Sequence, residues 1–177
     1  GSLKWHLDAK YLRDKDGNPD TLTEISGEYN QIWEVYGATD DAEGYIKLID
    51  GDGVTGEGVK SEDELMSDPS TLKEFINYAK AIAPADKYDL FLNDHGCGPG
   101  RGYGFDDHDP ENPEVVMHVL KLKKAISESD VVKNGGKFDI INFDCCMMGN
   151  FETILTLADY TDYFLGSADV APLPTVD

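Results

Sequence analysis

Apolar positions recur at helical spacing in three segments after about residue 65. The first segment begins with Asp68-Pro69, an N-cap acceptor followed by proline at the first helical position, and it ends before Pro84. The second covers residues 120–127 and the third about residues 150–160. Their spacing predicts amphipathic helices, and the apolar stripe of the first is more typical of a core face than of a ligand face. That stripe consists of Leu72, Phe75, Ile76, Ala79 and Ile82.

Short apolar runs bounded by turn residues lie between these predicted helices. Residues 88–93, 138–143 and 163–167 have the composition of buried strands, and residues 115–119 suit either a short strand or the entry to the next helix. The 14 or so residues after Gly100 are rich in Gly, Asp, Asn and Pro and predict a loop. Alternation of helices and strands predicts an α/β fold whose parallel sheet is covered on both faces.

The first 60 residues contain two alternating apolar runs, residues 31–36 and 45–49, which predict strands with one exposed face. Acidic turns separate them. Asp14, Asp16, Asn18 and Asp20 occupy alternate positions, as in a calcium loop, but Pro19 stands in place of the usual glycine and no glutamate closes the loop. The composition is therefore more typical of plain turns than of a metal site.

The composition bounds the class of protein. A chain of 177 residues is long enough to bury a single core, so one domain is expected, and no apolar run is long enough to cross a bilayer. The formal net charge of −20 disfavours a nucleic-acid or anionic membrane partner. It suits a cationic substrate or calcium, or it serves only solubility. Three cysteines cannot form a disulfide framework.

Two of the predicted strands are each followed by a reactive residue, His95 after the first and Cys146 after the second. Right-handed connections bring successive parallel strand ends to one edge of a sheet, so both residues are expected to face one cleft. A thiolate beside an imidazole is the minimum for acyl transfer. Cys145 and Cys146 lie in a predicted strand-to-helix turn, where backbone N–H groups favour a thiolate. Taken singly, a histidine at such a position is more often a structural residue whose polar groups are hydrogen-bonded, and a cysteine there more often packs as a small apolar residue.

These two stretches resemble a known family. Residues 90–96, read as LFLNDHG, followed by residues 140–149, read as IINFDCCMMG, are similar to the paired signature of the clostripain family of cysteine peptidases, within the caspase-like superfamily. The similarity covers about residues 68–169. It implies a caspase-like three-layer α/β/α sandwich with a mostly parallel central sheet. Because that family's domain opens with a further strand and helix and continues beyond position 177, residues 1–177 are expected to be one partial peptidase domain.

The resemblance also assigns site residues. His95 falls on the catalytic histidine and Cys146 on the nucleophile, whereas Cys145 falls where the family usually has a small residue and is interpreted as packing. The backbone N–H groups of Gly96 and Cys146 are expected to hold the oxyanion. Asp144 matches an aspartate that lines the specificity pocket, with capping of the following turn as the alternative, and Asp169 lies where further pocket residues are found.

The function implied by the resemblance is cysteine endopeptidase activity after Arg or Lys, carried by a Cys-His dyad. No cofactor or catalytic metal is required, although some relatives use calcium as an activator. The expected partners are proteins or peptides with a basic residue at the cleavage site, and the remaining part of the same peptidase as a separate chain or missing segment. A secreted or cell-envelope location follows. The loop of residues 106–114 holds no Lys or Arg, so the activation site stays open.

Two other functions compete with this interpretation. The first is a catalytically silent binding or adhesion domain that keeps the caspase-like fold. The second is a redox switch, because adjacent cysteines such as Cys145 and Cys146 can form a strained disulfide. The switch is disfavoured, since that ring would remove the thiolate which the turn is placed to stabilise.

Overall fold

The computed structural model describes residues 11–14, 16–19, 30–50, 65–107, 109, 111 and 116–171. Contacts divide the chain into two compact units, Gly1–Glu64 and Leu65–Asp177, and each is described by itself. That all 177 residues form one domain therefore stays a prediction.

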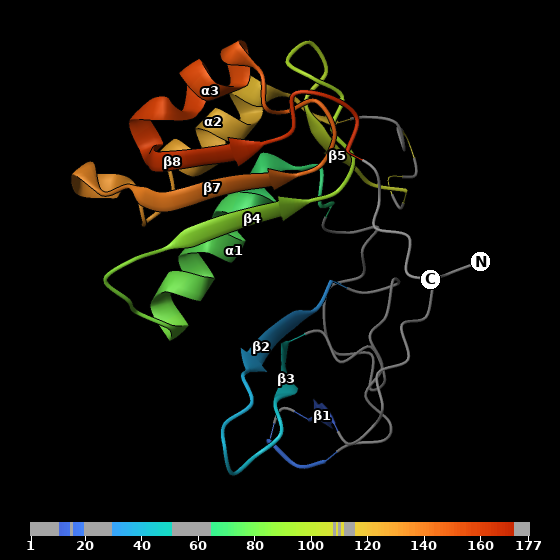
Figure 1. The fold of residues 1–177 in the computed structure, drawn as a ribbon, viewed down its shortest axis with the longest axis vertical. Coiled ribbons are helices and arrows are strands. Elements are labelled where there is room, and N and C mark those ends of the chain that lie inside the picture. Colours follow the sequence, from blue (N-terminus) through green and yellow to red (C-terminus); the bar gives the residue numbers. More distant parts are fainter. Residues whose placement is uncertain are drawn as a thin grey trace. The chain divides into compact units, whose positions relative to one another are not determined.

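The first unit contains a small sheet of three strands in the order β1-β3-β2 (Figure 1). The strands are β1 (Leu12–Arg13), β2 (Ile32–Tyr36) and β3 (Tyr45–Asp50). β3 runs parallel to β1 and antiparallel to β2. Leu48 of β3 is buried, and the rings of Tyr36 and Tyr45 stack with centroids 4.5 Å apart. The two strands predicted in this part of the chain are confirmed.

The acidic turn near Asp14 is closed by its own side chains. The backbone N–H of Asn18 donates to Asp14 Oδ1 at 2.8 Å, and Asn18 Nδ2 donates to Oδ2 at 3.3 Å. Gly17 has a φ of 84°, which glycine adopts without strain. Both carboxylate oxygens are thus engaged inside the turn, as the plain-turn interpretation expects, while Asp20 lies outside the described residues.

The second unit is built on a sheet of three parallel strands in the order β4-β7-β8 (Figure 1). These are β4 (Asp89–Asn93), β7 (Phe138–Asp144) and β8 (Thr161–Gly166). β7 is central and is the longest of these strands at seven residues, and its side chains at Phe138, Ile141 and Phe143 are buried. The predicted parallel sheet is confirmed, and the carboxyl ends of its strands meet at one edge.

Three helices connect and cover these strands. They are α1 (Pro69–Ile82), α2 (Val119–Ser127) and α3 (Phe151–Leu157). A short 3₁₀ turn, η2 (Lys133–Gly135), comes after α2, and another, η3 (Ala158–Tyr160), comes after α3. Each helix starts with a side-chain cap, given by Asp68, His118 and Asn150 respectively. Asp68 Oδ1 accepts from Ser70 N at 2.7 Å, and hydrogen bonds from Ser70 hold the pKa of that carboxyl below its usual value.

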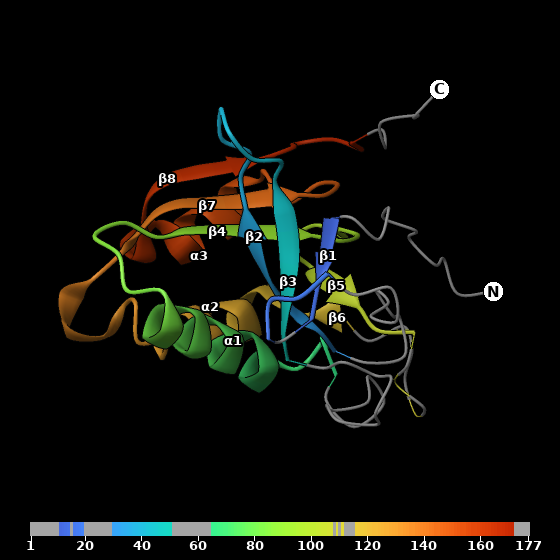
Figure 2. The same cartoon turned by 90° about the horizontal axis from the view of Figure 1, so that it is seen from below.

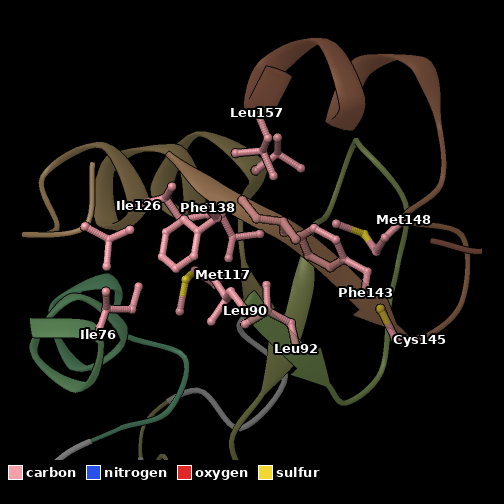
Figure 3. Packing of buried hydrophobic residues seen from close by; sticks show 14 residues of the cluster. Ile76, Leu90, Leu92, Met117, Ile126, Phe138, Phe143, Cys145, Met148 and Leu157 are labelled. Atoms are coloured by element: carbon pink, nitrogen blue, oxygen red, sulfur yellow. The ribbon is translucent and has the colours of Figure 1, made fainter. Parts of the chain in front are cut away.

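The three helices share a single core with one face of the sheet (Figures 2 and 3). Its buried members include Ile76, Leu90, Leu92, Met117, Leu122, Ile126, Phe138, Ile141, Phe143, Met148 and Leu157. Leu72 packs against this core, but Phe75 and Ile82 are about half exposed, so the buried stripe of α1 is narrower than predicted. Helical spacing shows which side of a helix faces inward, whereas the neighbouring helix decides how much of that side is covered.

The opposite face of the sheet carries apolar side chains that remain open. Phe91 is 62% exposed, Tyr163 70% and Leu165 49%, and the strand register places Phe91 and Leu165 on either side of Asn142. The described residues therefore form the sheet and one helical layer of the predicted sandwich, and they do not themselves form the third layer.

A two-stranded antiparallel pair follows the histidine loop. β5 (Tyr103–Phe105) lies in the segment predicted as a loop, and it pairs with β6 (Val116–Met117), which is the short strand that was one of the two alternatives for residues 115–119. Gly102 and Gly104 have φ values of 118° and 62°, so their conformation requires glycine and the composition resembles that of a loop. Tyr103 packs edge-on against Phe143 with ring centroids 5.7 Å apart. This tertiary contact holds β5 beside the ends of the parallel strands.

Candidate active site

The two stretches singled out in the sequence leave the sheet side by side. Asn93, the last residue of β4, pairs directly with Asp144, the last residue of β7. The segment that begins at Asp94 and the turn that begins at Cys145 therefore start from adjacent strand ends. The parallel register places the predicted histidine and both cysteines at the same edge of the sheet.

Gly96 is the point at which the histidine loop touches the cysteine turn. A β-carbon at this position would overlap the backbone oxygen of Cys146, and it would lie 2.9 Å from Cys145 Sγ and from Met148 Cγ. No side chain fits there without displacing backbone. The close approach brings His95, the preceding residue, next to the turn that carries Cys146.

Gly96 also forms an antiparallel bridge with Tyr103 of β5. The bridge is made by two flanking hydrogen bonds: Gly104 N donates to His95 O at 2.9 Å, and Cys97 N donates to Gly102 O at 2.8 Å. Among the described residues, no hydrogen bond uses the N–H of Gly96 or that of Cys146, so both can donate to a ligand.

His95 is exposed, and one face of its imidazole stacks on Phe105, with ring centroids 5.0 Å apart and planes 6° from parallel. Its backbone N–H donates to the Asp94 carboxylate. Desolvation by the surrounding protein atoms raises the pKa of the Asp94 carboxyl, although the hydrogen bond from His95 works against the rise.

Cys146 is half buried in a turn held by the segment that follows β8. Its Sγ donates to Ala171 O at 3.8 Å, Met147 N donates to Asp169 O at 3.1 Å, and Gly149 N donates to Ser167 O at 2.8 Å. Met147 has a φ of 58°, which is uncommon for a residue other than glycine and marks a sharp turn. The three contacts fix where the thiol lies.

The helix that follows the cysteines begins where the sequence predicted it, at about residue 150. α3 starts at Phe151, and the side chain of Asn150 caps it by accepting from Thr153 N at 2.9 Å. Cys145 and Cys146 therefore lie in the turn between β7 and α3, as expected. That this turn stabilises a thiolate stays a prediction.

Cys145 belongs to the core. Its side chain is 5% exposed and packs near Phe143 and Met148 at the end of β7 (Figure 3). Burial raises the pKa of the Cys145 thiol to about 12. The interpretation of Cys145 as a packing residue is confirmed, and of the two adjacent cysteines only Cys146 is partly exposed.

Cys145 is predicted to resist alkylation in the folded protein. An upward pKa shift makes the thiolate scarcer at every pH below the raised value, so a shift from 9.0 to about 12 lowers the reactive fraction near pH 8 by about a thousandfold. Mass spectrometry after iodoacetamide treatment should find Cys146 modified and Cys145 unmodified until denaturant is added. Native labelling of Cys145 at the denatured rate would contradict this.

Asp144 and Asp169, the predicted substrate-binding carboxylates, both border the cysteine turn and are exposed. Asn93 Nδ2 donates to Asp144 Oδ2 at 2.9 Å, which orients that carboxylate. Among the described residues no backbone N–H donates to the Asp144 side chain, so the structure gives no sign of the turn-capping role. Asp169 Oδ1 accepts from Val170 N at 2.7 Å. Sequence reasoning missed Asn93, because its role depends on strand pairing.

Among the described residues, no group of three or more His, Cys, Asp or Glu side chains is placed to hold a metal ion. No described helix is long and apolar enough to cross a membrane.

Comparison of the sequence with models of protein families shows to which family the chain belongs. The model of the clostripain family matches residues 21–177. The chain belongs to the clostripain family. This family of cysteine peptidases is the one that the two sequence motifs indicated, and the match extends well before them.

The chain is also similar to individual cysteine peptidases in sequence and in structure. Clostripain of Hathewaya histolytica is 29% identical over 121 residues, which is 63% of this chain and 22% of clostripain. A secreted C11 cysteine protease of Bacteroides thetaiotaomicron, solved with an irreversible peptide inhibitor, has a TM-score of 0.61 and 24% identity over 82% of this chain. An inactive zymogen C11 protease of Parabacteroides distasonis has a TM-score of 0.60 and 23% identity over 83%.

The chain spans only part of these relatives. It covers 22% of clostripain, 37% of the Bacteroides structure and 36% of the Parabacteroides structure. The structural similarity establishes the caspase-like α/β fold of a clostripain-family peptidase.

Proposed function

We propose that the protein is a cysteine endopeptidase that cleaves after Arg or Lys, with Cys146 as the nucleophile and His95 as its acid and base. The main support is the approach of Gly96 to Cys146, which no side chain larger than glycine permits. This contact joins the loop carrying the exposed imidazole to the turn carrying the accessible thiol. Membership of a cysteine peptidase family supports the same chemistry.

In the proposed reaction, Cys146 Sγ attacks the carbonyl carbon of the scissile bond and forms a thioester through a tetrahedral intermediate. The unused N–H groups of Gly96 and Cys146 donate to the oxyanion. His95 gives a proton to the departing amine and later takes one from the water that hydrolyses the thioester. Cys146 then returns to its starting state.

The basic specificity is proposed for Asp144, with Asp169 as a second carboxylate beside the same turn. Asn93 holds one oxygen of Asp144 and leaves the other for a ligand, because a carboxylate has acceptor capacity for more than one donor. A guanidinium or ammonium would pair with it directly. The net charge of −20 adds a long-range attraction for cationic substrates at low salt.

Replacing Asp144 with Asn is expected to lower kcat/KM for substrates with Arg before the scissile bond by about 100-fold, because a charged hydrogen bond at the substrate is lost. A matched substrate with Gln at that position should change by less than about threefold. Fluorogenic peptides that differ only in this residue measure both values. The control is Asp162→Asn in β8, an exposed residue that removes the same charge and lies 3.8 Å from Lys137.

Equal losses on the Arg and Gln substrates, or equal losses in the Asp162 variant, would contradict a direct role of Asp144 in specificity.

Secretion is part of the proposal, supported by the secreted Bacteroides relative. We also propose that further polypeptide completes the peptidase, because the chain covers only part of the length of its relatives. Among the described residues, Asp14 is engaged by Asn18, and no group of three or more His, Cys, Asp or Glu side chains is placed to hold a metal ion. Activation by calcium therefore stays an expectation from the family, and no step of the mechanism depends on it.

A silent binding domain is not favoured, because the comparisons lead to cysteine peptidases. The deciding experiment incubates the complete protein with peptides that carry Arg, Lys or Asp before a fluorophore, with and without calcium. Cleavage after Arg and Lys but not after Asp is expected. Absence of turnover together with absence of thiol labelling at Cys146 would overturn the proposal. A redox switch between Cys145 and Cys146 has no support, since both thiols are free and Cys145 lies in the core.

A further inference from the structure

We propose that Phe105 is a positioning residue for His95: its ring fixes the plane of the imidazole that serves the thiol of Cys146. The inference rests on the proposed Cys-His function. Its basis is the near-parallel stack of the two rings, with centroids 5.0 Å apart and planes 6° from parallel.

The imidazole lacks the usual means of orientation. In Ser-His-Asp enzymes, a carboxylate accepts a hydrogen bond from the histidine ring and holds its tautomer and direction. Here, among the described residues, no hydrogen bond involves either ring nitrogen of His95; the carboxylate of Asp94 receives the backbone N–H instead. The stack on Phe105 is the described contact that restricts rotation of the ring about χ2.

Phe105 is itself held in place from three sides. It ends β5, which pairs with Val116 of β6. The preceding residue, Gly104, donates its N–H to His95 O at 2.9 Å, so the strand with Phe105 is tied to the backbone of the histidine it stacks on. The following residue, Asp106, is buried and accepts from Met66 N at 2.8 Å, which anchors the strand near the start of α1.

This arrangement serves a dyad well. A flat apolar ring limits the tilt of the imidazole but takes none of its nitrogens, so both remain available for the thiol and for the leaving amine. An imidazole that rotates freely about χ2 spends less time in the reactive geometry. Misplacement of a catalytic group by about 1 Å can lower the rate by about 100-fold. Loss of Phe105 should therefore appear in kcat more than in KM.

The test compares Phe105→Leu and Phe105→Tyr in the complete protein. The Leu variant keeps an apolar side chain and loses the ring, and it should lower kcat by about 10-fold to 100-fold with KM changed by less than about threefold. The Tyr variant keeps the ring and should restore kcat to within about threefold of the natural protein. The control is Phe75→Leu, the same substitution at a half-exposed residue of α1.

A second measurement separates positioning from folding. In Cys146→Ala protein with labelled histidine, ring current from Phe105 should shift the His95 ring-proton resonances upfield, and the shift should disappear in the Leu variant and persist in the Tyr variant. Unchanged His95 resonances in the Leu variant would overturn the proposal, as would an unchanged kcat. If the natural protein cleaves nothing, the proposed function fails, and the resonances alone still decide whether Phe105 positions the ring.

Discussion

Cys146→Ala is expected to abolish peptide hydrolysis, with kcat lower by about 10⁴-fold or more, because removal of the nucleophile leaves only binding and the oxyanion donors. Cys146 is half buried, and His95 and Gly96 lie on the adjacent loop. Among the described residues, no hydrogen bond uses the backbone N–H of Gly96 or that of Cys146. The measurement is hydrolysis of an Arg fluorogenic peptide by the complete protein, with binding of a peptide inhibitor as a check that the site persists.

The matched control is Cys145→Ala, which removes the neighbouring thiol. Cys145 is packed in the core and its pKa is raised to about 12, so it cannot act as a thiolate near neutral pH. Its replacement should leave kcat within about threefold and lower the free energy of unfolding by about 1 kcal/mol, the cost of a small cavity. Loss of activity in the Cys145 variant, with retention in the Cys146 variant, would reverse the assignment of the nucleophile.

Gly96→Ala is expected to be the most damaging change that leaves every proposed catalytic side chain in place. The added β-carbon would overlap the backbone oxygen of Cys146 and crowd Cys145 Sγ at 2.9 Å, so the histidine loop must move away from the cysteine turn. Overpacking against backbone should lower the free energy of unfolding by about 3 kcal/mol. A displaced loop separates His95 from Cys146, and kcat should fall by about 100-fold or more.

Gly100→Ala is the matched control in the same loop. A β-carbon at Gly100 would meet no atom within 4 Å, so the substitution should change neither the melting temperature nor kcat appreciably. Thermal unfolding and Arg-peptide hydrolysis measure the two effects. Equal behaviour of the Gly96 and Gly100 variants would contradict the close approach of the two loops, and with it the main support for the proposed site.

Local pattern was sufficient to predict the helices and the parallel strands described in the second unit. Asp68-Pro69 marks the first turn of α1, and the apolar run of residues 138–143 becomes the central strand β7. Caps and apolar periodicity act over a few residues, so one sequence contains them. Strand β5 escaped prediction because Gly102 and Gly104 give it the composition of a loop, and it is held by the contact of Tyr103 with Phe143, which is distant in the sequence.

The candidate site divides in the same way. The sequence by itself determined the clostripain relationship, the identity of His95 and Cys146 as the expected pair, and the parallel order that brings strand ends to one edge, because these follow from motif residues and from the handedness of strand connections. The tertiary structure decided which thiol is buried and that Gly96 leaves room for the cysteine turn. It also placed Asn93 in hydrogen-bond contact with Asp144 and stacked Phe105 on His95. These depend on distances between residues far apart in the chain, which only the packed fold fixes.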